Sequence, residues 1–294
     1  MSLKQKIGVC LLTGALMLNS CASSSQIKAL ENKVQNLEQK ISRITLANNI
    51  RDVDELYLKM IAPTVRVELN LEDAYGIGAG TVLYSKKKDD LVYSYILTAS
   101  HVVDTDELLS SIDVYEYSLS QSKEIIYSAN LIAQNKITDL AVIEVISDKE
   151  LQVADLIPKD KVNDVKIFDR VYTVGCPTED PPLQSYGELT NKRTLLGGGD
   201  FWRINAPIKE GNSGGGVYLE NTKELIGVSI MIEEDFLEHN YKNKKIFLKD
   251  HEVIFPHLGI IVSPTAIYDF LDEENLQFIY DNDYSREECL ERRR

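Results

Sequence analysis

Gly211-Asn-Ser-Gly-Gly215 is the stretch of this 294-residue sequence that decides its fold. Glycine on both sides of Ser213 lets the backbone take a tight, partly left-handed path that a Cβ atom would forbid. That path turns successive N–H groups inward, so the amides of Gly211 and Ser213 are candidates for an oxyanion hole. The pentapeptide alone is equally compatible with a surface turn, and two other segments decide between these interpretations.

The sequence supplies a candidate base and a candidate acid for this serine. A serine hydroxyl becomes a nucleophile only when a base takes its proton and a third group orients that base. His101 ends the apolar run Tyr95-Ile-Leu-Thr-Ala-Ser-His101, and Asp139 directly precedes the mostly apolar, strand-like run Leu-Ala-Val-Ile-Glu-Val over residues 140–145. Each residue alone is usually structural. The order His101, Asp139, Ser213, with a glycine-framed serine last, predicts a catalytic triad.

The three segments resemble the histidine, aspartate and serine motifs of trypsin-like serine peptidases, specifically the bacterial HtrA/Deg-like branch. The match covers about residues 65–270 and includes the glycine-rich run over residues 76–83. The resemblance implies an all-β, chymotrypsin-like fold of two six-stranded antiparallel barrels with a C-terminal helix. It implies a serine endopeptidase that acts on proteins or peptides, with His101 as general base, Asp139 as its orienting partner and Ser213 as nucleophile. We expect no cofactor and no metal.

The same resemblance locates a primary substrate pocket. It places Pro207 at the base of that pocket, six residues before Ser213, where trypsins carry an acid. Because no carboxylate stands there, we do not expect this pocket to prefer Lys or Arg. Ile208, Ile230 and Ile232 would make it narrow and apolar, which favours small or medium aliphatic side chains. The alternative is that these isoleucines only fill the core.

The N-terminus predicts export. Lys4 and Lys6 precede an uncharged run over residues 7–18, which is too short to span a bilayer but fits the apolar core of a signal peptide. Leu18-Asn-Ser-Cys21 then resembles a bacterial lipobox, so we expect residues 1–20 to be removed and Cys21 to carry lipid. An ordinary secretory signal cut elsewhere is the alternative.

Ala22 bears on the destination of the anchored protein. It is not the aspartate that retains lipoproteins in the inner membrane of diderm bacteria. We therefore expect the chain on the periplasmic face of the outer membrane in such a cell. In a cell with one membrane, we expect it on the outer face of the cytoplasmic membrane.

Residues 21–51 predict a lipidated anchor followed by a coiled-coil stalk. Apolar side chains alternate spacings of three and four along residues 27–44, which is the a/d pattern of a heptad repeat. We expect self-association through residues 27–44, with a trimer favoured and a dimer possible. A single amphipathic helix packed on the barrel is the alternative. The a and d positions are Ile27, Leu30, Val34, Leu37, Ile41 and Ile44.

The chain is acidic, with a formal net charge of −14. Removing residues 1–20 takes away two lysines and no acids, which leaves 30 Lys and Arg against 46 Asp and Glu. This balance argues against nucleic acid as a partner and against electrostatic binding to anionic lipid. Membrane attachment should therefore depend on the lipid. Cys176 and Cys289 could pair in an exported chain, or remain as two thiols.

The remaining sequence predicts a peptidase domain over residues 52–272 and a loosely attached polar tail over residues 273–294, with no room for a PDZ domain. Ser263 and Pro264 predict the N-cap and first turn of a helix that ends near Asp272. Short β-branched and aromatic runs predict strands. They cover residues 64–69, 77–84, 93–98, 112–117, 140–146 and 165–174.

Residues 233–257 look like an insertion between two late strands, near the expected substrate cleft. His239, His251 and His257 suggest a metal site, but their spacing fits no compact zinc pattern. A solvated loop that covers the cleft or recognises substrate is favoured. Two functions of other classes stay open: a catalytically silent binding module on the same fold, and an envelope scaffold built on the coiled coil.

Overall fold

The computed structural model describes residues 33–35, 37, 40, 54–72, 74–105, 110–117, 124–194, 199–232 and 258–293. The chain divides into two units, Met1–Asp54 and Glu55–Arg294. The described residues of the first unit are helical. The predicted signal peptide, Cys21, most of the predicted stalk and residues 233–257 lie outside the described residues, so their proposed roles stay predictions.

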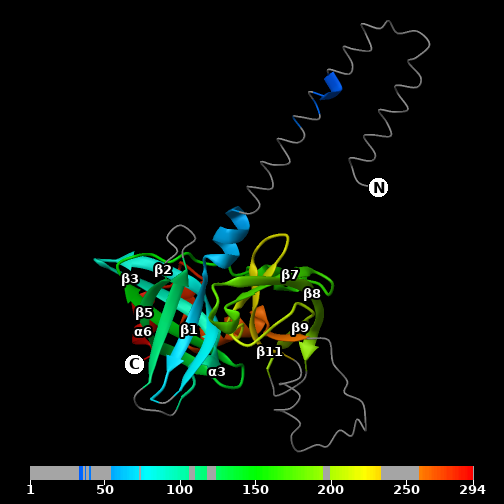
Figure 1. Ribbon diagram of the computed structural model, residues 1–294. Coiled ribbons are helices and arrows are strands. Elements are labelled where there is room, and N and C mark those ends of the chain that lie inside the picture. Colours follow the sequence, from blue (N-terminus) through cyan, green and yellow to red (C-terminus); the bar gives the residue numbers. More distant parts are fainter. Residues whose placement is uncertain are drawn as a thin grey trace, which may run out of the picture. The chain divides into compact units, whose positions relative to one another are not determined.

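The second unit contains two closed antiparallel barrels, each of six strands in the described part of the chain (Figure 1). The strand order is β1-β2-β3-β6-β5-β4 in the first barrel and β7-β8-β9-β12-β11-β10 in the second, so the same connection pattern occurs twice. This confirms the predicted chymotrypsin-like fold class. The first barrel comprises β1 Thr64–Asn70, β2 Tyr75–Lys88, β3 Leu91–Ala99, β4 Ser111–Tyr117, β5 Glu124–Asn135 and β6 Leu140–Ser147. The second comprises β7 Arg170–Gly175, β8 Leu183–Thr194, β9 Phe201–Ile204, β10 Gly216–Leu219, β11 Leu225–Ile232 and β12 Gly259–Val262.

Short helical segments connect and flank the barrels. They are η1 Tyr57–Ile61, α3 Ser100–Val103, η2 Lys159–Asp164, η3 Pro177–Glu179, α5 Pro264–Glu273, η4 Gln277–Ile279 and α6 Arg286–Glu291. The predicted terminal helix is confirmed as α5. Its N-cap is Ser263, whose Oγ accepts a hydrogen bond from the N–H of Ala266 at 3.1 Å.

Side-chain alternation and continuous apolar runs explain the strands of the first barrel. In β1, Val65, Val67 and Leu69 point inward and are at most 4% exposed. In β6, residues 140–145 are all buried, and Glu144 among them pairs with Arg286 of the C-terminal segment. The strand predicted over residues 165–174 is wrong in its first half, where residues 166–169 form a turn and β7 begins only at Arg170.

One cluster of buried apolar side chains extends through both barrels. This larger cluster also includes the C-terminal segment, and it contains Val102, Val228 and Phe270. A smaller cluster lies in the second barrel around Trp202 and Ile261. Burial of this apolar surface is the main force that joins the barrels.

The prediction of a loosely attached polar tail over residues 273–294 is wrong. Leu276, Phe278, Ile279 and Cys289 are each at most 7% exposed. The rings of Phe278 and Tyr95 meet edge to face with their centroids 5.0 Å apart. Apolar residues spaced irregularly through a polar segment give no periodic signal, so the docking could not be predicted from the sequence.

Arg286 ties this C-terminal segment to two neighbouring strands. Its guanidinium donates to the Tyr95 hydroxyl on β3 and to the Glu144 carboxylate on β6, both at 2.8 Å. It also lies 3.9 Å from the ring centroid of Tyr93. Tyr95 in turn donates to Glu144. Burial and this carboxylate both raise the pKa of the Tyr95 hydroxyl.

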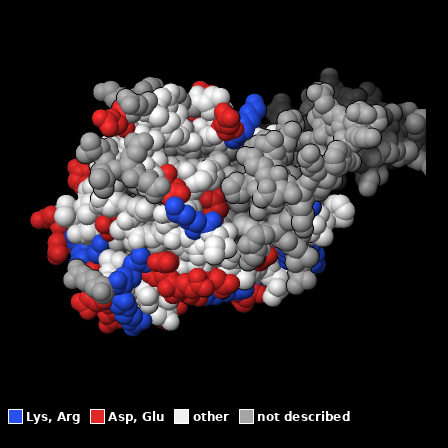
Figure 2. Space-filling model, turned by 90° about the horizontal axis from the view of Figure 1, so that it is seen from below, with Lys and Arg blue, Asp and Glu red and all other residues white. Residues whose placement is uncertain are grey.

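Acidic and basic side chains are mixed on the surface of the protein that Figure 2 shows. On the face shown in Figure 2, acidic side chains are spread over the described part of the protein, with basic side chains between them. This distribution accords with the net charge of −14. The net negative charge attracts cationic ligands to the whole protein. Any effect of one carboxylate on such a ligand adds to this general attraction.

We predict that Arg286→Leu lowers the free energy of unfolding by about 3 kcal/mol, because it leaves Glu144 buried without its cation. Urea denaturation of the chain beginning at residue 22 measures this. The control is Lys88→Ala, which breaks the half-exposed pair with Glu287. It should cost no more than about 1 kcal/mol. Equal losses in the two variants would contradict the assignment.

Candidate active site

Ser213 lies in the turn between β9 and β10, where the second barrel meets the first. Gly211 and Gly214 both have a φ of +87°, a conformation that only glycine takes without strain. A Cβ atom on Gly214 would lie 2.0 Å from the carbonyl oxygen of Ala79. The carbonyl oxygen of Ser213 accepts a hydrogen bond from the N–H of Ala79 at 2.7 Å, which fastens the loop to β2.

This loop leaves two amide groups available for a ligand. The N–H groups of Asn212 and Gly214 donate to backbone carbonyl groups at 3.0 and 2.7 Å. Among the described residues, the N–H groups of Gly211 and Ser213 have no such backbone acceptor. These are the two amides predicted to form an oxyanion hole.

His101 and Asp139 form a bidentate contact. His101 lies in the single-turn helix α3, immediately after β3, and Asp139 lies in the turn that precedes β6. One carboxylate oxygen of Asp139 is 2.7 Å from Nδ1 of the imidazole, and the other accepts the backbone N–H of His101 at 2.9 Å. The carboxylate therefore holds both the ring and the backbone of His101.

The turn that carries Asp139 is built for this position. Asp139 has a φ of +55°, a left-handed conformation that aspartate tolerates better than most residues. The side-chain oxygen of Asn135 accepts the N–H groups of Ile137 and Thr138, at 2.9 and 3.1 Å. The carbonyl of Asp139 accepts from Ser100 at 3.1 Å. The β5–β6 turn and the end of β3 are thus joined at the site.

The contact sets the tautomer of the imidazole. An ionised carboxylate can only accept a hydrogen bond, so the bond to Asp139 requires the proton on Nδ1 of His101. In the neutral ring Nε2 then carries a lone pair and can take up a proton. The His101 side chain is 48% exposed and that of Asp139 is 16% exposed, so the ring faces solvent while its partner is mostly covered.

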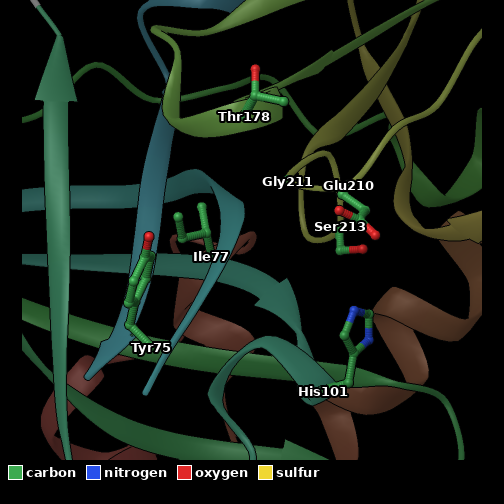
Figure 3. A pocket seen from close by; sticks show the side chains of 7 residues that line it. All are labelled: Tyr75, Ile77, His101, Thr178, Glu210, Gly211 and Ser213. Carbon is green, nitrogen blue, oxygen red and sulfur yellow. The ribbon is translucent and has the colours of Figure 1, made fainter. Parts of the chain in front are cut away.

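His101 and Ser213 line one cavity of about 640 Å³, at the junction of the barrels (Figure 3). In this structure Ser213 Oγ donates to the carbonyl of Ile230 at 3.0 Å. No hydrogen bond within the described residues joins Ser213 Oγ to His101. Figure 3 shows the two side chains facing the same space. The cavity is lined by Tyr75, Ile77, His101, Thr178, Glu210, Gly211 and Ser213.

The residues predicted to form the primary pocket do not line this cavity. Ile208 and Ile230 are buried in the two core clusters, as in the alternative reading of these isoleucines, and Pro207 is exposed. The side chain of Ile232 lies outside the described residues. The primary pocket predicted from these four residues is therefore not this cavity, and it stays a prediction.

Four lining residues were not found by sequence reasoning. Tyr75 directly precedes the glycine-rich run at the start of β2, Ile77 lies within it, and Glu210 directly precedes the serine loop, so proximity to a motif could have indicated them. Thr178 has no such signal, because it comes from a short segment after β7 and reaches the cavity only through the tertiary fold.

Cys176 is hydrogen-bonded to the serine loop through its backbone. Its N–H donates to the carbonyl of Gly211 at 3.2 Å, and its side chain is fully buried. Burial raises the pKa of the Cys176 thiol to about 12, so the group is inert at neutral pH. Cys176 and Cys289 are both free thiols in this structure.

Neither a metal cluster nor a membrane helix occurs in the described ranges. Over those residues, no group of three or more His, Cys, Asp or Glu side chains is placed to hold a metal ion. No helix among them is long and apolar enough to cross a membrane.

The fold and this site define the class of protein. A family model described as a trypsin-like peptidase domain matches residues 78–228, which is more than half of the chain, and the chain belongs to that family. The matched residues include His101, Asp139 and Ser213. The prediction of a trypsin-like peptidase domain is thus confirmed.

Similar proteins are bacterial serine endoproteases. The chain is 31% identical, over 141 residues, to a probable periplasmic serine endoprotease DegP-like from Brucella suis, which covers 47% of this chain and 25% of that protein. It is 27% identical over 160 residues to the serine endoprotease DegS of Haemophilus influenzae, covering 53% and 41%. A serine endoprotease structure from Yersinia pestis has the same fold, with a TM-score of 0.53, 22% identity, and coverage of 76% and 66%.

We predict that Gly214→Ala lowers the free energy of unfolding by more than about 2 kcal/mol, because the new Cβ would overlap the Ala79 carbonyl at a positive φ. Gly76→Ala is the matched control. Its nearest neighbour would be 3.9 Å away, so its stability should stay within about 1 kcal/mol of wild type. Urea denaturation of both variants checks this, and an unchanged Gly214→Ala protein would contradict the close contact.

Proposed function

We propose that this protein is an exported, lipid-anchored serine endopeptidase that hydrolyses peptide bonds in envelope or misfolded proteins. The observation that carries the proposal is the bidentate contact of Asp139 with His101, which lines one cavity together with Gly211 and Ser213. The family of the domain and the similar endoproteases support it.

The first half of the reaction uses the three side chains in sequence. The Ser213 hydroxyl rotates away from the Ile230 carbonyl and donates to Nε2 of His101, which takes its proton as Oγ attacks the scissile carbonyl carbon. Asp139 keeps the ring in the productive tautomer and stabilises the imidazolium that forms. The amides of Gly211 and Ser213 donate to the developing oxyanion. His101 then gives its proton to the leaving amine, and the peptide bond breaks.

The second half regenerates the enzyme. Water loses a proton to Nε2 of His101 and attacks the ester carbonyl carbon on Ser213. Collapse of the tetrahedral intermediate returns the proton to Ser213 Oγ and releases the acid product. Every proton transfer in both halves passes through His101, and no cofactor enters the scheme.

A catalytically silent binding module is the second candidate. The observation that favours it is the Ser213 hydroxyl, which donates to Ile230 rather than to His101. In a binding module this bond would persist, and the cavity would hold peptide without cleaving it. In an enzyme, substrate or a change in the loop must turn the hydroxyl towards Nε2.

We predict that a fluorophosphonate probe labels the chain beginning at residue 22 at Ser213 and nowhere else. Ser213→Ala should abolish labelling. Asp139→Asn should slow it about 10³- to 10⁴-fold, because an amide in place of the carboxylate favours the wrong tautomer of His101. Gel fluorescence and peptide mapping provide the measurement.

Circular dichroism spectra of the variants control for loss of fold. Absence of labelling in folded wild-type protein, combined with binding of unfolded protein substrates, would favour the binding module instead. Equal rates in wild type and Asp139→Asn would contradict the triad.

We further propose that Cys21 carries the lipid and that residues 27–44 associate into a trimer, with a dimer as the alternative. The support is the lipobox-like Leu18–Cys21 segment and the heptad pattern. The similar Brucella protein is described as periplasmic, which accords with export. The lipid would hold the stalk at the membrane, and the associated stalks would place several peptidase domains at its surface.

We predict that Cys21→Ser releases the protein from the membrane. Without acylation, the apolar run over residues 7–18 is too short to anchor the chain, and the acidic domain has no charge attraction to anionic lipid. Fractionation of cells that express each form measures the distribution, and radiolabelled palmitate measures acylation. Cys176→Ser is the control. Equal membrane retention of the Cys21→Ser protein would contradict the anchor.

A further inference from the structure

The lining of the cavity beside Ser213 includes a charged residue that has no role in the catalytic steps described above. Of its seven lining residues, Glu210 is the only one with a carboxylate. Tyr75 and Ile77 of β2 supply an aromatic and an aliphatic surface, and Tyr75 is 62% exposed. Thr178 of η3 also lines the cavity, and its hydroxyl donates to the carboxylate of Asp180 at 3.2 Å. A volume of about 640 Å³ accommodates more than one amino-acid side chain.

Glu210 is available to a ligand. It is an exposed residue, and it forms no ion pair with any residue in the described part of the chain. Figure 3 places it beside Ser213 on one wall of the cavity, with Tyr75 and Ile77 across the space. A long side chain with an apolar stem and a cationic end would contact both walls.

The chemistry of peptide cleavage indicates which part of a substrate reaches this cavity. His101 protonates the leaving amine, so the leaving side of the substrate lies next to the imidazole. The cavity is lined by that imidazole. It is not lined by Pro207, Ile208 or Ile230, which are predicted to receive the side chain on the acyl side of the bond. The cavity therefore faces the residues that follow the scissile bond.

From this geometry we infer that Glu210 selects substrates with Lys or Arg at the first or second position after the scissile bond. The inference rests on the proposed peptidase function. Ion pairing with Glu210 favours the cation, and repulsion disfavours Asp or Glu at the same positions. It is compatible with an aliphatic preference in the primary pocket, because the two pockets lie on opposite sides of the bond.

The expected effect is moderate. An ion pair at a solvent-accessible rim is screened, so a single charge should change kcat/KM about two- to fivefold. The negative surface of the whole protein also attracts basic peptides. A control that removes an exposed carboxylate away from the cavity therefore has to accompany any change at Glu210. Glu273, exposed at the end of α5, fits this purpose.

The first test digests a proteome-derived peptide library with the chain beginning at residue 22 and reads the cleaved bonds by mass spectrometry. Wild type should enrich Lys and Arg two- to fivefold at the two positions after the bond. Glu210→Gln should remove the enrichment, and Glu210→Lys should replace it with Asp and Glu. Glu273→Gln should behave as wild type. No enrichment in wild type, or enrichment that survives Glu210→Lys, would overturn the inference.

The second test separates this inference from the proposed function. In the Ser213→Ala protein, saturation-transfer difference NMR compares binding of the dipeptide amides Ala-Arg, Arg-Ala, Ala-norleucine and Ala-Glu. At least one arginine peptide should bind two- to fivefold more tightly than Ala-norleucine, and Ala-Glu more weakly. Ser213→Ala/Glu210→Gln should remove the difference. Equal binding of all four peptides would refute the role of Glu210. Absence of any Ser213-dependent cleavage would refute only the peptidase.

Discussion

The site depends on a contact in which two backbones touch without side chains between them. The N–H of Ala79 on β2 donates to the carbonyl of Ser213 at 2.7 Å. A Cβ atom on Gly78 would lie 2.8 Å from that same oxygen, and one on Gly214 would lie 2.0 Å from the Ala79 carbonyl. Glycine at both positions lets the first barrel and the serine loop approach this closely. Any larger residue would push Ser213 away from the barrel that carries His101.

Each barrel supplies one half of the site. In the first, β3 and β6 pair so that Ala99 lies opposite Leu140, which brings the residues that follow and precede them, His101 and Asp139, to the same end of the sheet. In the second, the turn between β9 and β10 presents Ser213 and its amides. The register of β3 and β6 thus determines where His101 and Asp139 lie relative to each other. The packing of one barrel on the other determines how close they lie to Ser213.

The C-terminal segment shows how a sequence pattern can mislead. Its composition is polar, yet Arg286 reaches Glu144 and Tyr95, which lie 142 and 191 residues earlier in the chain. Contacts between residues so far apart in the chain leave no periodic pattern in the sequence. A mostly buried, paired arginine such as Arg286 cannot be told from an exposed one by its sequence neighbours. The same limit applies to Thr178, which lines the cavity only through the arrangement of loops. The start of β7 was predicted too early for a local reason. A turn in which Phe168 has a φ of +75° interrupts the apolar run before Arg170.

The sequence by itself indicated the three candidate catalytic residues and the amides of the glycine loop, because motif order and the conformational freedom of glycine are properties of short segments. Its resemblance to trypsin-like peptidases predicted the fold class. It also predicted export, a lipid anchor and a stalk, most of whose residues lie outside the described part of the chain. Only the tertiary structure decided that the C-terminal segment belongs to the first barrel and that Glu210 shares a cavity with Ser213. It also decided that the Ser213 hydroxyl rests on Ile230. Those features depend on which distant surfaces meet, and that is settled by packing two barrels around a common core rather than by any run of neighbouring residues.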